Sequence, residues 1–125
     1  MADVFADVVD GFGHRLGIAG LAPGPGGVVD LRIERLGRLQ LEALGDDLLV
    51  TLIRPWPPRA KNAARTALSL CHWRENHAWD IHAGARGSED LALTARLPLG
   101  EADVPTLERL LPYLANLLNQ IEQAG

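Results

Sequence analysis

The chain has 125 residues, of which 47% are hydrophobic, a size and composition typical of one globular domain with its own core. Sixteen acidic and twelve basic side chains give a net charge of -4, and the bases are dispersed, which argues against nucleic acid or an anionic membrane as the main partner. No apolar run approaches the roughly 20 residues of a membrane span, and the acidic start of the chain is the opposite of a basic secretory signal.

Residues 3–16 are predicted to form a helix with one apolar face. Apolar residues recur there at helical spacing, while acidic residues lie on the opposite face. Gly17 stands where a helix C-cap belongs. Residues 18–27 contain five consecutive prolines and glycines, 23–27, and are predicted to be a loop. This loop precedes a strand and lacks the lysine and the following helix of a phosphate-binding loop, so we expect no phosphate site there.

Three strands are predicted between residues 28 and 54, separated by turn residues. In the first two, apolar and polar residues alternate with period two, which indicates an antiparallel sheet with one dry face and one wet face. The third, residues 48–53, is apolar on both faces apart from Thr51, so we expect it to be covered on both sides. The apolar positions of the first two strands are Val29, Leu31, Ile33, Leu39, Leu41 and Ala43.

A proline-rich run at residues 55–58 ends these strands, because proline cannot donate to a strand ladder. A second helix is predicted over about residues 59–73, and its apolar stripe consists mostly of small residues, which allow a close approach. Two interpretations stay open: the stripe packs on the sheet of its own chain, or it contacts the same helix of a second subunit. The stripe comprises Ala60, Ala63, Ala64, Ala67 and Cys71, flanked by Leu68 and Leu70.

Two more strands are predicted at residues 79–86 and 91–97. The last helix is expected to begin near Asp103, a good N-cap, and Pro112 on its wet face is expected to bend it around the core. The element order predicts one α+β sandwich domain over residues 1–125, an antiparallel sheet with three helices in the order α-β-β-β-α-β-β-α. The apolar stripe of the last helix is Leu107, Leu110, Leu111, Leu114, Leu117, Leu118 and Ile121.

The densest polar cluster lies between Cys71 and His77. Cysteine and histidine are zinc ligands, but the cluster has no second cysteine, and the spacing of His72, Glu75 and His77 matches no metalloprotease order. Cys71 lies in an apolar stripe, where a structural thiol is commoner than a nucleophile. The sequence therefore predicts no catalytic residue, no metal and no cofactor. As the only cysteine, Cys71 cannot form an internal disulfide, which favours the cytoplasm.

Three tryptophans, Trp56, Trp73 and Trp79, flank the second helix and the fourth strand. Aromatic residues at the ends of elements often close a core. Tryptophan is also enriched among interface anchors, so a contact between subunits is the competing interpretation.

Three stretches of the chain carry a resemblance to a known family. Residues 12–18 (Phe-Gly-His-Arg-Leu-Gly-Ile) close the first helix, residues 28–33 (Val-Val-Asp-Leu-Arg-Ile) open the sheet, and residues 91–99 lead into the last helix. With the element order, the size and the acidic charge, they resemble the class I chaperones of bacterial type III secretion, the Tir chaperone group. Such chaperones are homodimers that hold the N-terminal segment of one secreted effector in an extended, secretion-ready form without ATP. The resemblance implies a dimer joined through the second helix and the fourth strand, and effector grooves built from the first helix and the neighbouring strands.

The leading hypothesis is thus an export chaperone for one effector or translocator, without enzymatic activity. One alternative is a regulatory or structural interaction domain of the secretion system on the same fold, and the other is a small metal or cysteine enzyme centred on Cys71, His72 and His77. The residues predicted for the effector groove, each also a candidate for plain core packing, are Phe5, Val9, Phe12, Val29, Leu31 and Leu39. The residues predicted for the dimer contact are Ala63, Ala67, Leu70, Cys71, Trp73, Trp79 and Ile81.

Overall fold

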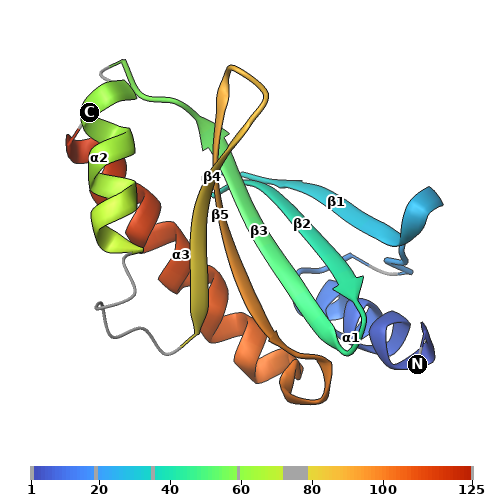
Figure 1. Ribbon diagram of the computed structural model, residues 1–125. Coiled ribbons are helices and arrows are strands. Elements are labelled where there is room, and N and C mark those ends of the chain that lie inside the picture. The colour runs from blue at the N-terminus through green and yellow to red at the C-terminus, as the bar shows by residue number, and fades with distance from the viewer. Residues whose placement is uncertain (1, 19, 35, 59, 72–78, 125) are drawn as a thin grey trace.

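The computed structural model describes residues 2–18, 20–34, 36–58, 60–71 and 79–124 (Figure 1). In this part of the chain the helices and strands follow the predicted order α-β-β-β-α-β-β-α. The helices are α1 (Ala2–Arg15), α2 (Ala60–Leu70) and α3 (Val104–Ala124), with short 3-10 turns at Pro25–Gly27 and Leu99–Glu101. The strands are β1 (Val28–Ile33), β2 (Gly37–Leu44), β3 (Asp47–Pro55), β4 (Asp80–Arg86) and β5 (Asp90–Pro98).

The strands form one antiparallel sheet in the order β1-β2-β3-β5-β4, so β1 and β4 are its edges. Since side chains alternate along a strand, each row of register partners presents one face of the sheet. One row across the sheet is buried and apolar: Val29, Leu41, Val50, Ala95 and Ile81. The next row faces the other way and is polar: Asp30, Gln40, Thr51, Thr94 and His82. The period-two pattern therefore predicts the two faces of the sheet correctly.

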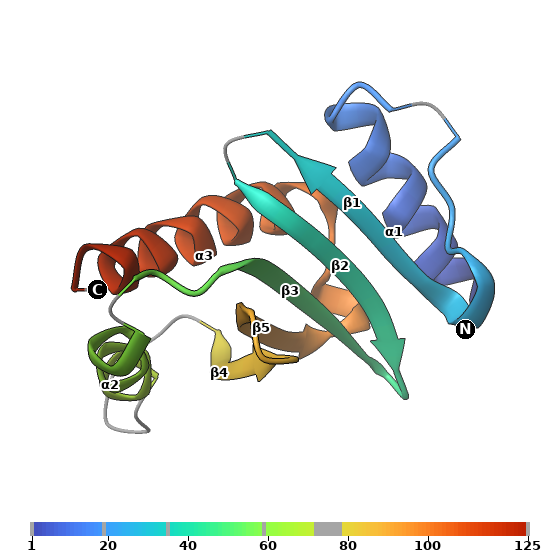
Figure 2. The same ribbon diagram turned by 90° about the horizontal axis from the view of Figure 1, so that it is seen from above.

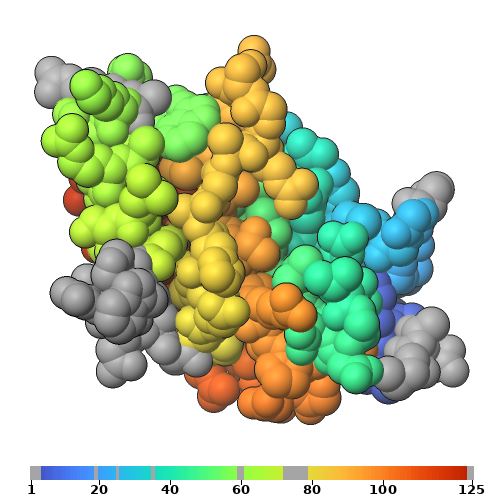
Figure 3. Space-filling model, viewed as in Figure 1, coloured from blue at the N-terminus to red at the C-terminus, as the bar shows by residue number. Residues whose placement is uncertain are grey.

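Helices α1 and α3 lie against the apolar face of the sheet, whereas α2 lies beyond the β4 edge and packs on α3 (Figures 1 and 2). No helix in the described part of the chain covers the opposite face, which is turned toward the viewer in Figure 3. Helix α2 thus has its main contact with a helix of its own chain, and Ala63 and Ala67 of its small-residue stripe are buried in the shared core. The residues of α3 that close the core are Leu107, Leu110, Leu111, Leu114, Ala115, Leu117, Leu118 and Ile121.

Strand β3 is apolar on both faces and is buried on both. Thr51 and Ile53, which point away from the helices, are 3% and 4% exposed. Thr51 Oγ1 lies 2.9 Å from Thr94 Oγ1 of β5, and the register partners of Ile53 are Arg38 and Ala92. The expected cover on both sides of this strand therefore comes from the helices on one face and from cross-strand neighbours on the other.

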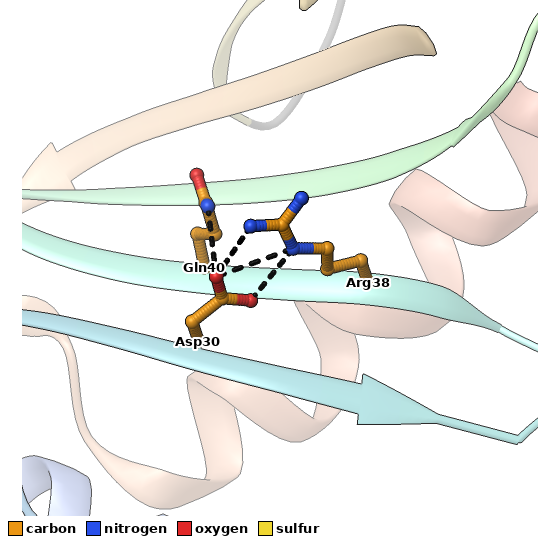
Figure 4. Close-up of polar contacts among 3 residues, drawn as sticks. All are labelled: Asp30, Arg38 and Gln40. Atoms are coloured by element: carbon orange, nitrogen blue, oxygen red, sulfur yellow. Dashed lines mark hydrogen bonds and ion pairs between the residues drawn. The ribbon is translucent and has the colours of Figure 1, made fainter.

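Charged side chains on the uncovered face pair across neighbouring strands. Asp30 of β1 accepts hydrogen bonds from Arg38 of β2, at 2.9 Å from Nε and 2.6 Å from Nη2, and a longer one from Gln40 (Figure 4). The bonds from Arg38 hold the pKa of Asp30 below its usual range. Arg96 of β5 donates to Asp47 of β3 at 2.6 Å. Exposed pairs of this kind orient side chains and contribute little to stability.

The ends of α3 and α2 differ in how well the sequence predicts them. Asp103 Oδ1 accepts a hydrogen bond from the backbone nitrogen of Thr106 at 2.9 Å, so α3 has the predicted N-cap. Hydrogen bonds from Thr106 also lower the pKa of Asp103. Pro112 is exposed on the outward side of α3, and the helix continues through it. Helix α2 ends at Leu70, and its predicted continuation over residues 72 and 73 lies outside the described residues.

Candidate partner-binding site

An apolar groove of about 350 Å³ lies between α1 and α3. Phe12 and Leu16 line the α1 side of the groove. Leu36, from the turn between β1 and β2, also lines it. Leu16 and Leu36 are half-buried, so part of this apolar surface remains open to solvent. The lining from α3 is Glu108, Leu111, Pro112, Ala115, Asn116 and Asn119.

The end of α1 is built so that Leu16 faces this groove. Gly17 has φ +81°, the left-handed conformation that glycine adopts without strain. The backbone nitrogen of Gly17 donates to His14 O at 3.1 Å, and that of Ile18 donates to Gly13 O at 2.7 Å. This pair of bonds is a Schellman motif, which ends the helix sharply at the predicted C-cap.

Opposite charges meet at one end of the groove. Arg15, in the last turn of α1, donates to both carboxylate oxygens of Glu108 on α3, at 3.1 and 3.0 Å. The hydrogen bond from Arg15 to Glu108 raises the pKa of the guanidinium. The pair joins the two helices that form the walls of the groove.

Arg54, near the end of β3, organises the other end of the groove. Its Nε donates to the carbonyl of Leu36 at 2.6 Å, and its Nη1 donates to Asn119 Oδ1 at 2.7 Å and to Glu122. The Arg54 side chain is only 12% exposed, because the turn between β1 and β2 and the last turns of α3 enclose it. A guanidinium with several acceptors in a fixed geometry ties these segments together.

Gly37 allows the turn between β1 and β2 to approach Arg54. Its φ of +122° is a conformation that other residues rarely adopt. A Cβ atom there would lie 2.6 Å from the carbonyl oxygen of Ile53 and 3.0 Å from Cγ of Arg54. Any other residue at this position would therefore force the turn or the end of β3 to shift.

A second cavity, of about 520 Å³, continues the groove toward the C-terminal end of α3. It shares Leu36 and Asn119 with the apolar groove, so the two form one connected surface. The surface is apolar between α1 and α3 and becomes charged beyond Asn119. The charged side chains of the second cavity are Arg32, Glu34, Arg54 and Glu122.

The outer edge of strand β1 is a second candidate surface for a partner. It pairs only with β2 in the sheet, and its outer edge receives one hydrogen bond, from the nitrogen of Gly24 to Val28 O at 3.1 Å, within the described residues. A shallow cavity of about 380 Å³ runs along this edge, with Leu21 and Val29 in its lining. An unpaired strand edge can accept a strand from another chain.

Most of the predicted groove residues belong to the core of the domain. Phe5, Val9, Phe12, Val29 and Leu39 are between 0% and 5% exposed and belong to the core, while Leu31 is half-buried. Of the six, only Phe12 lines the apolar groove. The groove residues that the sequence analysis did not select are Leu16, Leu36, Glu108, Leu111, Pro112, Ala115, Asn116 and Asn119. Leu16 and Leu111 stand at the margins of predicted apolar stripes, which is the signal that identifies them.

The predicted dimer residues divide between the core and the surface of the α2 side. Ala63, Ala67 and Ile81 are buried within the chain, at 0%, 2% and 4% exposure. Leu70 and Cys71 are half-buried, as is Trp79, whose ring packs edge-on against Tyr113 with centroids 5.3 Å apart. Trp73 lies outside the described residues. The exposed apolar side chain of α2 is Leu68, at 69%.

The enzyme alternative would need a cysteine nucleophile or a metal site, and the described residues form neither. Burial raises the pKa of the Cys71 thiol, which disfavours the thiolate. His72 and His77 lie outside the described residues, and those that are described contain no group of three or more His, Cys, Asp or Glu placed to hold a metal ion. No described helix is long and apolar enough to cross a membrane. A cavity of about 720 Å³ beside Trp79 is lined by charges of both signs, which does not suit an apolar segment.

Comparisons with known proteins agree with this fold. The family model described as "Type III secretory system chaperone SycN" matches residues 5–122. The structure of the HopA1–SchA chaperone–effector complex aligns with TM-score 0.75 and 18% identity, over 98% of this chain and 96% of that chain. The ExsC–ExsE complex aligns with TM-score 0.78 and 18% identity, over 98% and 94%. The Yersinia pestis type III secretion chaperone SycH, in complex with a stable fragment of YscM2, aligns with TM-score 0.74 and 11% identity, over 94% and 98%. A search of curated proteins found no match.

Proposed function

Because the chain belongs to the type III secretory system chaperone SycN family, we propose that it binds one secreted effector or translocator through that protein's N-terminal region and keeps it soluble and secretion-competent. The observation that carries this proposal is the open apolar groove between α1 and α3, with the free edge of β1 nearby. The similar SchA structure is of a chaperone–effector complex, which supports the same kind of partner here. The chaperone acts in the cytoplasm, where the partner is held before export.

The groove and the strand edge suit complementary parts of an unfolded segment. Leu16, Leu36 and Leu111 offer apolar contacts for large side chains, and removal of such side chains from water is the main driving force for association. The edge of β1 offers backbone donors and acceptors, so that a strand of the partner can extend the sheet. The two together bind a segment without requiring it to fold, which is what export demands.

The proposed assembly is a homodimer joined through the α2 side. Leu68 of α2 is 69% exposed, and Ala64, one turn before it, is half-buried. Helix α2 and the free edge strand β4 are adjacent on one face of the molecule (Figure 3). In this assembly Leu70, Cys71, Trp73 and Trp79 contribute to the contact, with Ala63, Ala67 and Ile81 supporting it from below.

The proposed role is non-enzymatic. The only cysteine has a raised pKa, so at neutral pH it is a protonated thiol and a poor nucleophile. The apolar groove contains one carboxylate, Glu108, and that group is paired with Arg15. A site that only holds a segment needs no group with a pKa near neutrality.

The test is co-expression of the full chain with N-terminal segments of the proteins that the host's own type III system exports. We expect one segment to co-purify with two copies of the chain, measured by light scattering, and to be protected from limited proteolysis over a continuous stretch. A partner that is a fixed component of the secretion apparatus would favour the regulatory or structural alternative. Failure of every exported segment to bind would contradict the chaperone proposal.

A further inference from the structure

Two asparagines stand on α3 where the apolar groove meets its charged end. Asn116 and Asn119 are both exposed and both line the groove. They are one helical turn apart on the same side of α3, a spacing that places their side chains roughly 5–6 Å from each other. Asn119 also lines the adjoining charged cavity, so it marks the boundary between the two.

The hydrogen bond from Arg54 determines which way the amide of Asn119 faces. A guanidinium only donates, so the oxygen of Asn119 must be the atom that lies 2.7 Å from Arg54 Nη1. Arg54 is itself held by the carbonyl of Leu36 and by Glu122. The amide nitrogen of Asn119, with two N–H donors, therefore points away from Arg54, and no partner for it exists within the described residues.

Glu108 is the charged residue that lines the apolar groove, and Arg32 and Glu34 lie in the adjoining cavity, so a neutral acceptor fits these donors within the groove. Glu108 is paired with Arg15, and Glu122 is paired with Arg54, so neither carboxylate is free to select a cation. Asn116 has no hydrogen-bond partner in the described part of the chain. The uncommitted polar groups along the groove are thus two amides, which bind a peptide carbonyl well.

We propose that Asn119, oriented by Arg54, donates a hydrogen bond to a backbone carbonyl of the partner segment in the apolar groove, and that Asn116 contacts a second carbonyl. The inference rests on the proposed function and names the residues that hold the partner's main chain. An extended chain presents carbonyls on one side about every 6.6–6.8 Å, close to the separation of the two asparagines. A helical segment has its carbonyls paired internally, so the bound segment is extended. Asn119 thereby holds the main chain while an apolar side chain enters the groove.

The test compares two variants that add the same charge to adjacent residues. The probe is the exported N-terminal segment that binds the wild-type chain most tightly, labelled with a fluorophore. Asn119→Asp keeps an oxygen for Arg54 but loses the N–H donors, and we expect its Kd to rise about tenfold, the size of one lost hydrogen bond. Gln120→Glu makes the same chemical change at an exposed residue that lines neither cavity, so its Kd should stay within about twofold of wild type. Asn119→Leu, which removes the donors without adding charge, should weaken binding as Asn119→Asp does.

A second measurement on the wild-type chain needs no substitution. The side-chain amide protons of Asn119 should shift in the NMR spectrum when the segment binds and exchange more slowly with solvent, while those of Gln120 should not. Unchanged Asn119 resonances, or wild-type affinity in both Asn119 variants, would overturn the inference and leave the chaperone proposal intact. If no exported segment binds the wild-type chain, the proposed function fails and the inference fails with it.

Discussion

The two sides of α3 leave different surfaces for a partner. On the α1 side, the large residues Leu16 and Leu111 line a groove, and half-buried Leu16 leaves part of its apolar surface open. On the α2 side, Ala63 and Ala67 pack at 0% and 2% exposure and close the seam, and the large apolar side chain of α2 that is exposed among the described ones is Leu68. Large residues thus line a groove in which we propose that the partner segment binds, whereas small residues close the seam beneath the surface proposed for a second copy of the chain.

Phe12→Ala is expected to have the largest effect, because it removes a side chain that serves both the core and the groove. Phe12 is 2% exposed and lines the groove from below. Truncation of a buried phenylalanine costs about 3–5 kcal/mol. Urea denaturation of the purified chain measures this loss. A loss of unfolding free energy below about 1 kcal/mol would contradict the placement of Phe12 in the core.

Leu68→Arg is expected to weaken the dimer by about a hundredfold while leaving the fold intact. Leu68 is 69% exposed in the single chain, so arginine meets no core atoms there, but two copies facing each other would bring like charges together at the seam. Sedimentation equilibrium measures the dimer constant. Ser69→Arg is the control at the adjacent exposed residue of α2. A Leu68→Arg chain that dimerises like wild type would move the contact away from the α2 side.

Leu16→Ser is expected to weaken partner binding by about tenfold, with little change in the stability of the chain. Leu16 is half-buried and its apolar surface lines the groove, so the substitution removes contact area for the bound segment. Val4→Ser is the matched control, since Val4 is an exposed apolar residue of α1 that lies outside the groove. Fluorescence titration with the exported segment gives both affinities. Equal losses in the two variants would show that α1 is sensitive along its length rather than at the groove.

The Asp30–Arg38 pair lies on the uncovered face of the sheet, away from both sides of α3, and should give the smallest effect. Hydrogen bonds from Arg38 lower the pKa of Asp30 in the folded chain. A lowered folded pKa contributes stability above the unfolded value of about 3.9, and this contribution is lost as pH falls through the folded pKa. Arg38→Gln should therefore lower the denaturation midpoint slightly at neutral pH, and the difference from wild type should shrink below about pH 4. A difference that grows on acidification would contradict this assignment.

The fold could be predicted from the sequence because each element carries its own local signal. Period-two alternation in β1 and β2, the leucine stripe of α3 and the N-cap at Asp103 are all readable without knowledge of their neighbours. The order of elements, in turn, is typical of an α+β sandwich of an antiparallel sheet and three helices. The comparison structures share this fold at high coverage.

The candidate site could be predicted only in part, because it depends on contacts between distant segments. An apolar stripe shows which residues turn away from water, but its centre faces the core, as Val9 and Leu39 do at 0% exposure. Residues at the margin of a stripe line a groove only where two helices, here α1 and α3, leave space between them. Leu36 and Asn119 are 83 positions apart in sequence (119 − 36), and Arg54 joins them in space. No local pattern around any of these three residues indicates that they meet.

The most direct test of the central claim is hydrogen exchange of the chain, measured by mass spectrometry with and without its bound exported segment. A segment held in the groove and along β1 should slow exchange at the end of α1, in β1 and in the turn around Leu36, with α2 unchanged between the free and bound dimers. Protection confined to α2 and β4, with the groove side exchanging as in the free chain, would contradict the account and place the partner on the opposite side of α3.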